Sequence, residues 1–190
     1  MKQYITDILI IGAGQAGLAL AYYLKSTNLS YQLVEGNRQI GDSWRKRYDA
    51  LTLFTPRSFS ALPGLALTGD PDGYATRDEF ADYLDNYASH FAFPIQLDQE
   101  IRLLEQVEGA FQVTTEAGDI FLSRVVVLAT GPFQKPKIPA IAKNFAPEIC
   151  QFTPETYKNA AQIPAGKVLV VGDGATGRDL ANELAQTHNV

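Results

Sequence analysis

The chain has 190 residues, of which 46% are hydrophobic and 19% are charged, and this balance is typical of a folded globular protein rather than a disordered one. Its net charge of −5 argues against a nucleic-acid partner, because binding to a phosphate backbone normally needs a basic face. The lone Cys150 excludes an internal disulfide, and the sequence has neither a signal-peptide pattern nor a run of about 20 apolar residues, so we expect a cytoplasmic protein with no membrane partner.

The first 35 residues have the pattern of a strand, a glycine-rich turn, a helix and a second strand. Residues 4–11 are mostly aliphatic or β-branched, as in a strand buried on both faces. A largely apolar helix is expected over residues 15–27 and a parallel strand over residues 31–35. The turn is a G-x-G-x-x-G fingerprint made of Gly12, Ala13, Gly14, Gln15, Ala16 and Gly17. This arrangement predicts an α/β, Rossmann-like fold with a parallel sheet.

Each glycine of this turn has a separate expected role. The first permits the bend, the second lets a pyrophosphate approach the backbone, and the third lets helix and strand pack closely. The helix N-terminus adds free N–H groups and a partial positive charge of about half a unit. Glu35 lies near the expected spacing of about 20 residues, where a carboxylate accepts hydrogen bonds from ribose hydroxyls and repels a 2′-phosphate. The first site therefore favours FAD or NAD over NADP.

Between the second strand and the next helix lies a segment rich in chain breakers. Residues 37–75 contain several glycines and prolines, which predicts an ordered insertion without long elements. Thr76 and Glu79 form a capping-box pair at the start of a helix that is expected to end near Phe91. Arg57, within the insertion, is expected to be exposed, where it would be solvated or reach a nicotinamide phosphate.

The next part of the chain predicts β-structure. Alternating segments over residues 99–123, separated by turn residues, predict an antiparallel meander. The apolar residues 124–128 predict a further strand, which ends at Ala129, Thr130 and Gly131. An FAD-binding domain is therefore expected over residues 1–131.

The pattern of strand, fingerprint and helix then begins a second time. Residues 132–164 are rich in proline and predict a linker, and residues 165–190 predict the start of an NAD(P)-binding domain, with a strand over 167–171 and a helix over 178–187. The second fingerprint consists of Gly172, Asp173, Gly174, Ala175, Thr176 and Gly177. The residue that separates NAD from NADP would fall beyond Val190, so the motif leaves open NAD, NADP or a turn that binds nothing.

These motifs, with the segments at residues 41–45, 51–56 and 62–64, resemble those of class B flavin-dependent monooxygenases, a group that includes the flavin-containing monooxygenases. The resemblance extends over essentially the whole chain. It implies an FAD-dependent, NAD(P)H-using oxidoreductase that oxygenates an unknown small-molecule substrate. By the same resemblance, the flavin would lie near Ser43, Trp44 and Thr55, the adenine near the backbone of Ile101, and Thr130 and Gly131 would close over the cofactor.

Two departures from that family limit the expected activity. Of the F-x-G-x-x-x-H-x-x-x-Y/F signature only Tyr157 is present, and Thr153 occupies the histidine position, so no catalytic residue is assigned. Relatives are also longer, which predicts a truncated form with little turnover by itself or, alternatively, a non-catalytic dinucleotide-binding or oligomerising remnant. Uncovered strand edges would favour a homo-oligomer. A disulfide reductase with a CxxC pair is excluded by the cysteine count.

Overall fold

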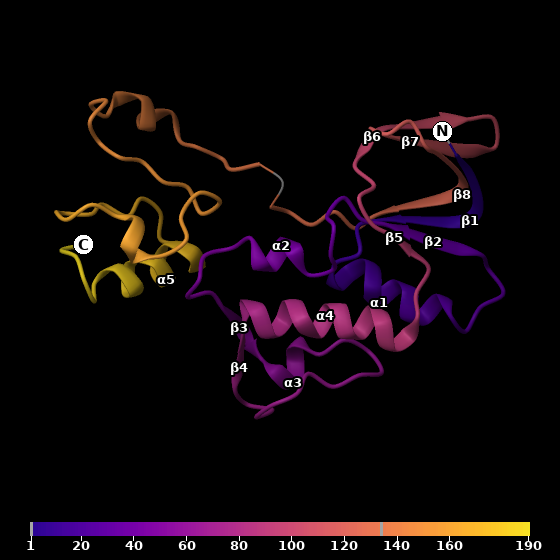
Figure 1. Cartoon of the computed structure of the whole chain (residues 1–190), viewed down its shortest axis with the longest axis horizontal. Helices are drawn as coiled ribbons and strands as arrows, with labels where there is room; N and C mark the ends of the chain where they lie inside the picture. Colours follow the sequence, from indigo (N-terminus) through magenta and orange to yellow (C-terminus); the bar gives the residue numbers. More distant parts are fainter. Residues whose placement is uncertain (1, 134) are drawn as a thin grey trace.

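The computed structural model describes residues 2–133 and 135–190; Met1 of the expected first domain and Gln134 of the expected linker lie outside this part of the chain. A six-stranded sheet lies at one end of the molecule and the C-terminal residues at the other, with helix α4 running between them (Figure 1). The sheet order is β5-β2-β1-β8-β7-β6. Its strands are β1 (Gln3–Ile11), β2 (Tyr31–Val34), β5 (Ile95–Gln96), β6 (Ile101–Val107), β7 (Ala110–Thr115) and β8 (Ile120–Leu128).

The sheet is parallel in its first half and antiparallel in its second. β5, β2, β1 and β8 run parallel, while β7 pairs antiparallel with both β8 and β6. Along β1, Ile10 packs into one core cluster whereas Leu9 and Ile11 pack into another, because successive side chains of a strand point to opposite faces. The expected α/β fold, with a first strand buried on both faces, is confirmed.

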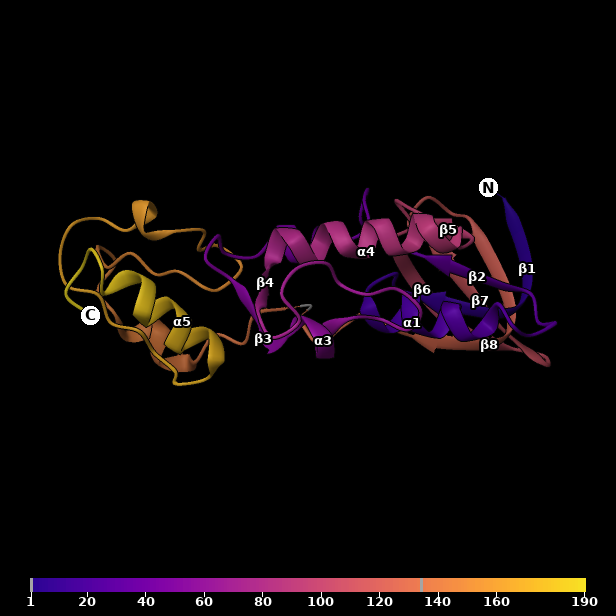
Figure 2. The ribbon, with the colours of Figure 1, turned by 90° about the horizontal axis from the view of Figure 1, so that it is seen from below.

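Two helices cover one face of the parallel strands (Figure 2). They are α1 (Gln15–Leu24) and α4 (Arg77–Phe91). Apolar side chains of both helices, such as Leu18, Leu84 and Tyr87, belong to the main core cluster. α4 begins with the expected capping box, in which the Thr76 side chain accepts from the Glu79 backbone and the Glu79 side chain accepts in return. None of the helices among the described residues combines the length and apolar character needed to cross a membrane.

The glycine- and proline-rich insertion is ordered by tyrosines of α4. The Tyr83 hydroxyl accepts from the Leu62 N–H at 2.6 Å and donates to the Leu65 carbonyl at 2.7 Å, and the Tyr87 hydroxyl donates to the Pro63 carbonyl at 2.6 Å. Buried hydroxyls thus satisfy backbone groups that have no strand or helix partner. The insertion contains α2 (Asp42–Arg45), β3 (Thr52–Pro56), α3 (Arg57–Ser60) and β4 (Tyr74–Thr76).

Arg57 is buried, which corrects the expectation of an exposed side chain. It is 9% exposed, and its guanidinium donates to the carbonyls of Thr68 and Tyr74 at 3.0 and 3.3 Å and to both carboxylate oxygens of Glu79 at 2.8 and 2.9 Å. The five N–H groups of arginine suit such a junction of three chain segments. Arg57 therefore holds the insertion to α4 and is not presented to a nucleotide.

Replacing Glu79 by alanine is expected to destabilise the protein by about 2 kcal/mol, since it leaves the buried Arg57 without its anion and removes half of the capping box. Hydrogen bonds from the Thr76 N–H and then from Arg57 hold the pKa of Glu79 below its usual range. Its stabilisation is thus present above the unfolded-state pKa and is lost as the pH falls through the lower folded-state value. Urea unfolding at pH 7 and at pH 3 should show the difference from wild type shrinking at the acidic pH.

The matched control is Asp78→Ala, on the same helical turn. The Asp78 side chain is 61% exposed and pairs with Arg77 at 3.1 Å, so its loss is expected to change stability by about 0.5 kcal/mol. Equal effects of the two substitutions at pH 7 would contradict the structural role of the Arg57–Glu79 pair.

The expected meander is present, but the boundary of its last strand differs. Residues 120–122 and 124–128 form one continuous strand, β8, which pairs antiparallel with β7 and parallel with β1. The polar Ser123 does not interrupt it, because its buried hydroxyl donates to carbonyls of Asp7 and Val125 at 3.1 and 2.7 Å. A polar residue therefore lies inside a strand where its hydroxyl is satisfied.

The second unit, residues 165–190, departs most from the expectation. The strand expected over residues 167–171 is not formed: the segment makes one isolated bridge, between Lys167 and Asn189. Its apolar sequence suits a buried parallel strand, yet no described strand lies beside it to complete a ladder. The helix expected over residues 178–187 is α5 (Ala175–Leu184), which begins earlier, within the fingerprint, and ends earlier. Two short 3₁₀ turns, η1 (Ala140–Asn144) and η2 (Ala160–Gln162), lie in the preceding linker.

Candidate nucleotide-binding sites

The first fingerprint is a turn in which two glycines are required by close packing. Gly12 follows β1 directly, has a φ of 106°, and an added Cβ would lie 2.4 Å from the Ala129 carbonyl oxygen. A Cβ on Gly17 would lie 2.0 Å from the Gly12 carbonyl oxygen. Both distances are far below van der Waals contact, so α1 packs against the turn only because these side chains are absent.

Gly14 differs because the space above it is open. No atom lies within 4 Å of the position where its Cβ would be. Gly14 is the N-cap of α1, no side chain caps this helix end, and its first turn carries no acidic residue. Gln15 and Ala16 are exposed in that turn. An open helix N-terminus with free N–H groups fits a diphosphate.

Glu35 is tied directly to this turn. Its Oε2 accepts from the Ala13 N–H at 2.9 Å, and its Oε1 accepts from the backbone N–H and the side-chain amide of Asn37 at 3.0 and 2.7 Å. Each carboxylate oxygen has two acceptor sites, so capacity remains for a further donor. The acid therefore stands at the carboxyl end of β2, beside the fingerprint, in a fixed orientation.

Three other predicted residues lie near the same edge of the sheet. Thr130 and Gly131 are exposed and follow β8, whose end lies beside Ile11 through the Ala129 N–H to Ile11 carbonyl bond of 2.8 Å. Ile101 begins β6, and the residues before it are joined to Glu35 by the Gln99 N–H, 2.9 Å from the Glu35 carbonyl. The structure thus gathers these residues around the carboxyl ends of the parallel strands, where ligands bind in α/β sheets.

The residues expected near a flavin make their contacts within the insertion and with α4. Trp44, on α2, is half-buried and packs edge-on against Phe80, with ring centroids 4.9 Å apart. Ser43 beside it is exposed. Thr55, on β3, is exposed and its hydroxyl lies 2.7 Å from that of Ser60. A flavin contact from these three side chains stays a prediction.

The second fingerprint reproduces the backbone of the first. Gly172 has a φ of 113°, Gly174 is the open N-cap of α5, and a Cβ on Gly177 would lie 2.1 Å from the Gly172 carbonyl oxygen. One feature differs, because a Cβ on Gly172 would meet no atom within 4 Å, whereas Gly12 lies against Ala129, the residue that follows β8. The turn therefore forms without a neighbouring strand.

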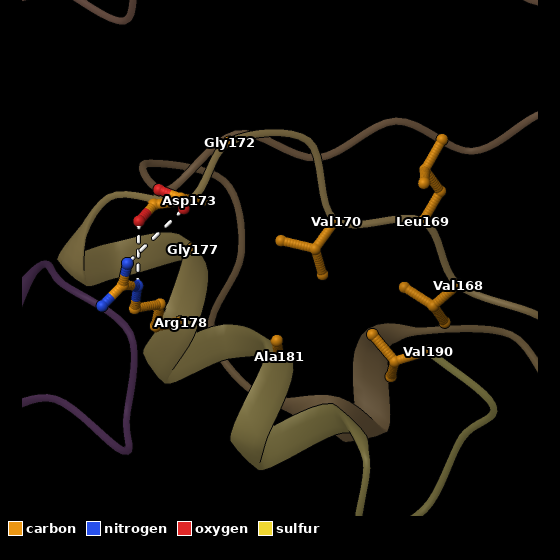
Figure 3. Close-up of a pocket in the computed structure, with 9 residues that line it drawn as sticks. All are labelled: Val168, Leu169, Val170, Gly172, Asp173, Gly177, Arg178, Ala181 and Val190. Atoms are coloured by element: carbon orange, nitrogen blue, oxygen red, sulfur yellow. Dashed lines mark hydrogen bonds and ion pairs between the residues drawn. The ribbon is translucent and has the colours of Figure 1, made fainter.

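A hollow of about 270 Å³ lies beside this second turn (Figure 3). Its apolar wall includes Val168, Val170 and Val190, and its polar side includes Asp173 and Arg178. The Arg178 guanidinium donates to the Asp173 carbonyl at 3.1 Å and pairs with its carboxylate at 3.4 Å. Ala175 is exposed and Thr176 half-buried at the start of α5.

One contact between the two units was not predicted from the sequence. The Tyr48 hydroxyl donates to Asp179 Oδ2 at 2.9 Å across 131 residues of chain. Tyr48 follows α2, whereas Asp179 belongs to α5. An isolated tyrosine in a loop gives no periodicity, spacing or motif that would reveal such a partner.

Comparison with known proteins places these features in a family. Residues 9–190 match the model of the pyridine nucleotide-disulphide oxidoreductase family. The chain is 50% identical over 188 residues to an uncharacterized oxidoreductase CzcO-like protein of Geobacillus kaustophilus, covering 99% of the chain and 54% of that protein. It is 29% identical over 190 residues to indole-3-pyruvate monooxygenase YUCCA1 of Oryza sativa, covering 97% and 46%.

A solved structure agrees in fold. The flavin-containing monooxygenase from Stenotrophomonas maltophilia superposes with a TM-score of 0.90 at 26% identity, over 99% of this chain and 56% of that one. The chain thus spans about half the length of the relatives it matches. With the family model matching nearly the whole chain, and with flavin monooxygenases among its relatives in sequence and in structure, the chain belongs to the pyridine nucleotide-disulphide oxidoreductase family and is a class B flavin monooxygenase-like protein.

Proposed function

We propose that the chain binds FAD at the first fingerprint and takes part in an NAD(P)H-using oxidation of the flavin monooxygenase type. The observation that carries the proposal is the first turn, where the open N-terminus of α1 at Gly14 stands beside Glu35, which is already oriented by the Ala13 N–H. A diphosphate and a ribose of one dinucleotide require this pair of features side by side. The proposed FAD-binding unit is residues 1–131, and the proposed start of the nicotinamide unit is residues 165–190.

The roles of the protein groups follow from this placement. The first-turn N–H groups of α1 would hold the diphosphate, Glu35 would accept from the ribose hydroxyls, and Thr130 and Gly131 would cover the cofactor. When bound, FAD would supply the transfer of electrons from a nicotinamide to molecular oxygen, while the protein orients the reactants and excludes water. The second turn, at Gly174, would receive the diphosphate of NADH or NADPH.

A second candidate function, a dinucleotide-binding module that associates without turnover by itself, is favoured by the segment before the second turn. Leu169 and Val171 are 73% and 64% exposed, and this apolar stretch makes one bridge instead of a strand ladder. Exposed apolar residues with unpaired backbone groups favour association with another chain. We therefore propose that the 190-residue polypeptide self-associates and that its turnover alone is low.

Absorption spectroscopy of the purified 190-residue chain tests the proposal. We expect a yellow protein with a flavin absorption band, or a colourless one that acquires the band after addition of FAD and removal of free cofactor. NADPH or NADH added without air should bleach the band if the second site is functional. If flavin is bound but neither nucleotide bleaches it, the result would favour the dinucleotide-binding module without turnover. A folded chain that retains no FAD would refute flavin binding.

A further inference from the structure

Tyr48 is the centre of a small apolar cluster that joins the two units. This interunit cluster consists of the buried residues Tyr48, Leu51, Tyr157 and Leu184. Tyr48 is fully buried. Its hydroxyl donates to Asp179 Oδ2 at 2.9 Å, and the Thr176 side chain of the second fingerprint interacts with the same phenol. Burial raises the pKa of Tyr48 well above its usual value, so the hydroxyl remains a donor at neutral pH.

The chain on either side of Tyr48 also reaches the second half of the molecule. The Asp49 N–H donates to the Lys158 carbonyl at 2.7 Å, and the Asp49 carboxylate accepts from the Asn159 amide at 2.6 Å. The Arg47 guanidinium lies over the Phe133 ring, 4.7 Å from its centre. These contacts engage the linker. The direct connection between residues 2–131 and α5 is the Tyr48–Asp179 hydrogen bond, together with the Thr176 side chain beside the same phenol and the apolar packing of the interunit cluster.

The interunit cluster connects α5 to α2. Trp44, four residues before Tyr48, packs against the main core at Phe80 and also against the interunit cluster. α2 carries two of the three side chains that the family resemblance would place near the flavin, Ser43 and Trp44. α5 lacks a sheet behind it, since residues 167–171 form no strand in the described chain. Its position therefore depends on the interunit cluster and on the Tyr48–Asp179 hydrogen bond.

We propose that Tyr48 is a positioning residue that fixes the second phosphate-binding turn relative to α2, and thereby sets where a nicotinamide nucleotide meets the flavin. The proposal rests on the function proposed above. Hydride transfer from a bound nicotinamide to a bound flavin would require the reacting atoms at about 3–3.5 Å, and a displacement of about 1 Å can lower the rate about 100-fold. The part-buried Tyr48–Asp179 hydrogen bond lies in the first half of α5, close to the turn whose displacement would move the nucleotide.

Four substitutions separate positioning from general stability. Tyr48→Phe removes the donor, and Asp179→Leu removes the acceptor. Asp179→Asn keeps an oxygen acceptor for the phenol and serves as the conservative rescue. Tyr157→Phe is the control within the same cluster: Tyr157 is 2% exposed, and its hydroxyl lies near the Glu183 carboxylate at the end of α5 without a hydrogen bond of ordinary geometry among the described residues. Its loss is expected to leave stability unchanged or slightly higher.

Two readouts are needed, both on the FAD-supplemented chain. In titrations with NADPH and with NADH, Tyr48→Phe and Asp179→Leu are expected to weaken binding about 10-fold, while Asp179→Asn, Tyr157→Phe and the FAD content match wild type. In hydrogen exchange, the first two substitutions should speed exchange of the amides of residues 178–180 about 10-fold, because the helix hydrogen bonds that protect these amides begin with Arg178 N–H to the Gly174 carbonyl and depend on the position of α5. The hydrogen-exchange measurement does not require a bound nicotinamide nucleotide.

The outcomes distinguish this inference from the proposed function. If the wild-type chain takes up no FAD, the proposed function fails, and exchange at α5 still reports on Tyr48. If the wild-type chain binds FAD but neither NADPH nor NADH, the hydrogen exchange of the α5 amides in the variants decides whether Tyr48 has the positioning role. Equal behaviour of Tyr48→Phe and Tyr157→Phe in exchange, or an Asp179→Asn chain as impaired as Asp179→Leu, would overturn the positioning role.

Discussion

Gly17→Ala should destabilise the protein by at least about 3 kcal/mol, a large loss for one added methyl group. The new Cβ would lie 2.0 Å from the Gly12 carbonyl oxygen and 3.3 Å from the Ile10 side chain. Backbone atoms cannot rotate away as a flexible side chain can, so α1 must move off β1. That movement opens the main core at Leu18 and Ala21, which are fully buried on the inner side of α1.

Two alanine substitutions give matched controls for this effect. Gly14→Ala adds the same methyl group in the same turn, where no atom lies within 4 Å, and is expected to change stability by about 1 kcal/mol or less. Gly177→Ala would place its Cβ 2.1 Å from the Gly172 carbonyl oxygen, but residues 167–171 belong to no sheet and can shift. Urea unfolding without FAD should therefore rank Gly17→Ala well above both; similar values for Gly17→Ala and Gly14→Ala would contradict the packing argument.

The elements that the sequence predicts well are those whose signals are local. The spacing of Gly12, Gly14 and Gly17 predicts the turn because Gly17 must pack against the backbone of Gly12 within the same turn, while Gly14 keeps the helix N-terminus open. The helix beginning after Thr76 is predicted equally well, since its capping box needs only residues three positions apart. Such features form in the same way wherever the surrounding chain allows them.

The features that sequence alone misses depend on distant partners. Arg57 looks like a loop arginine, and its burial follows from acceptors on three other segments, including Glu79. Residues 167–171 have the composition of a strand, but a parallel strand exists only with a neighbour to receive its hydrogen bonds. Tyr48 meets Asp179 across 131 residues. In each case the residue type is compatible with several environments, and the tertiary contact selects one.

The predicted site residues differ in how closely the structure brings them together. The family rests on a match over residues 9–190. The site residues rest on geometry that is strongest at the first turn, where the open Gly14 and the oriented Glu35 lie together, and weakest at Ser43 and Thr55, which are exposed within the insertion. Substitutions in the first turn are therefore expected to have the largest effect on cofactor binding.

Gly14→Val should lower the affinity for FAD by about 100-fold or more, the loss expected when a diphosphate can no longer reach the N–H groups of a helix N-terminus. Valine would fill the space above Gly14 that is open in the structure, and its φ of −81° is accessible to any residue. The helix itself should form, with a cost of about 1 kcal/mol for a poor N-cap. Flavin fluorescence during titration with FAD measures the affinity, and urea unfolding checks the fold.

Gly174→Val is the control with the same chemistry at the other turn. Gly174 is also an open N-cap, on α5, so this variant should keep the FAD affinity of wild type while losing affinity for NADH or NADPH where the wild-type chain binds them. If Gly14→Val binds FAD normally, the first turn does not hold the diphosphate. If both variants lose FAD equally, the loss comes from a general disturbance of the fold, because the two turns lie in separate units and share no side chain.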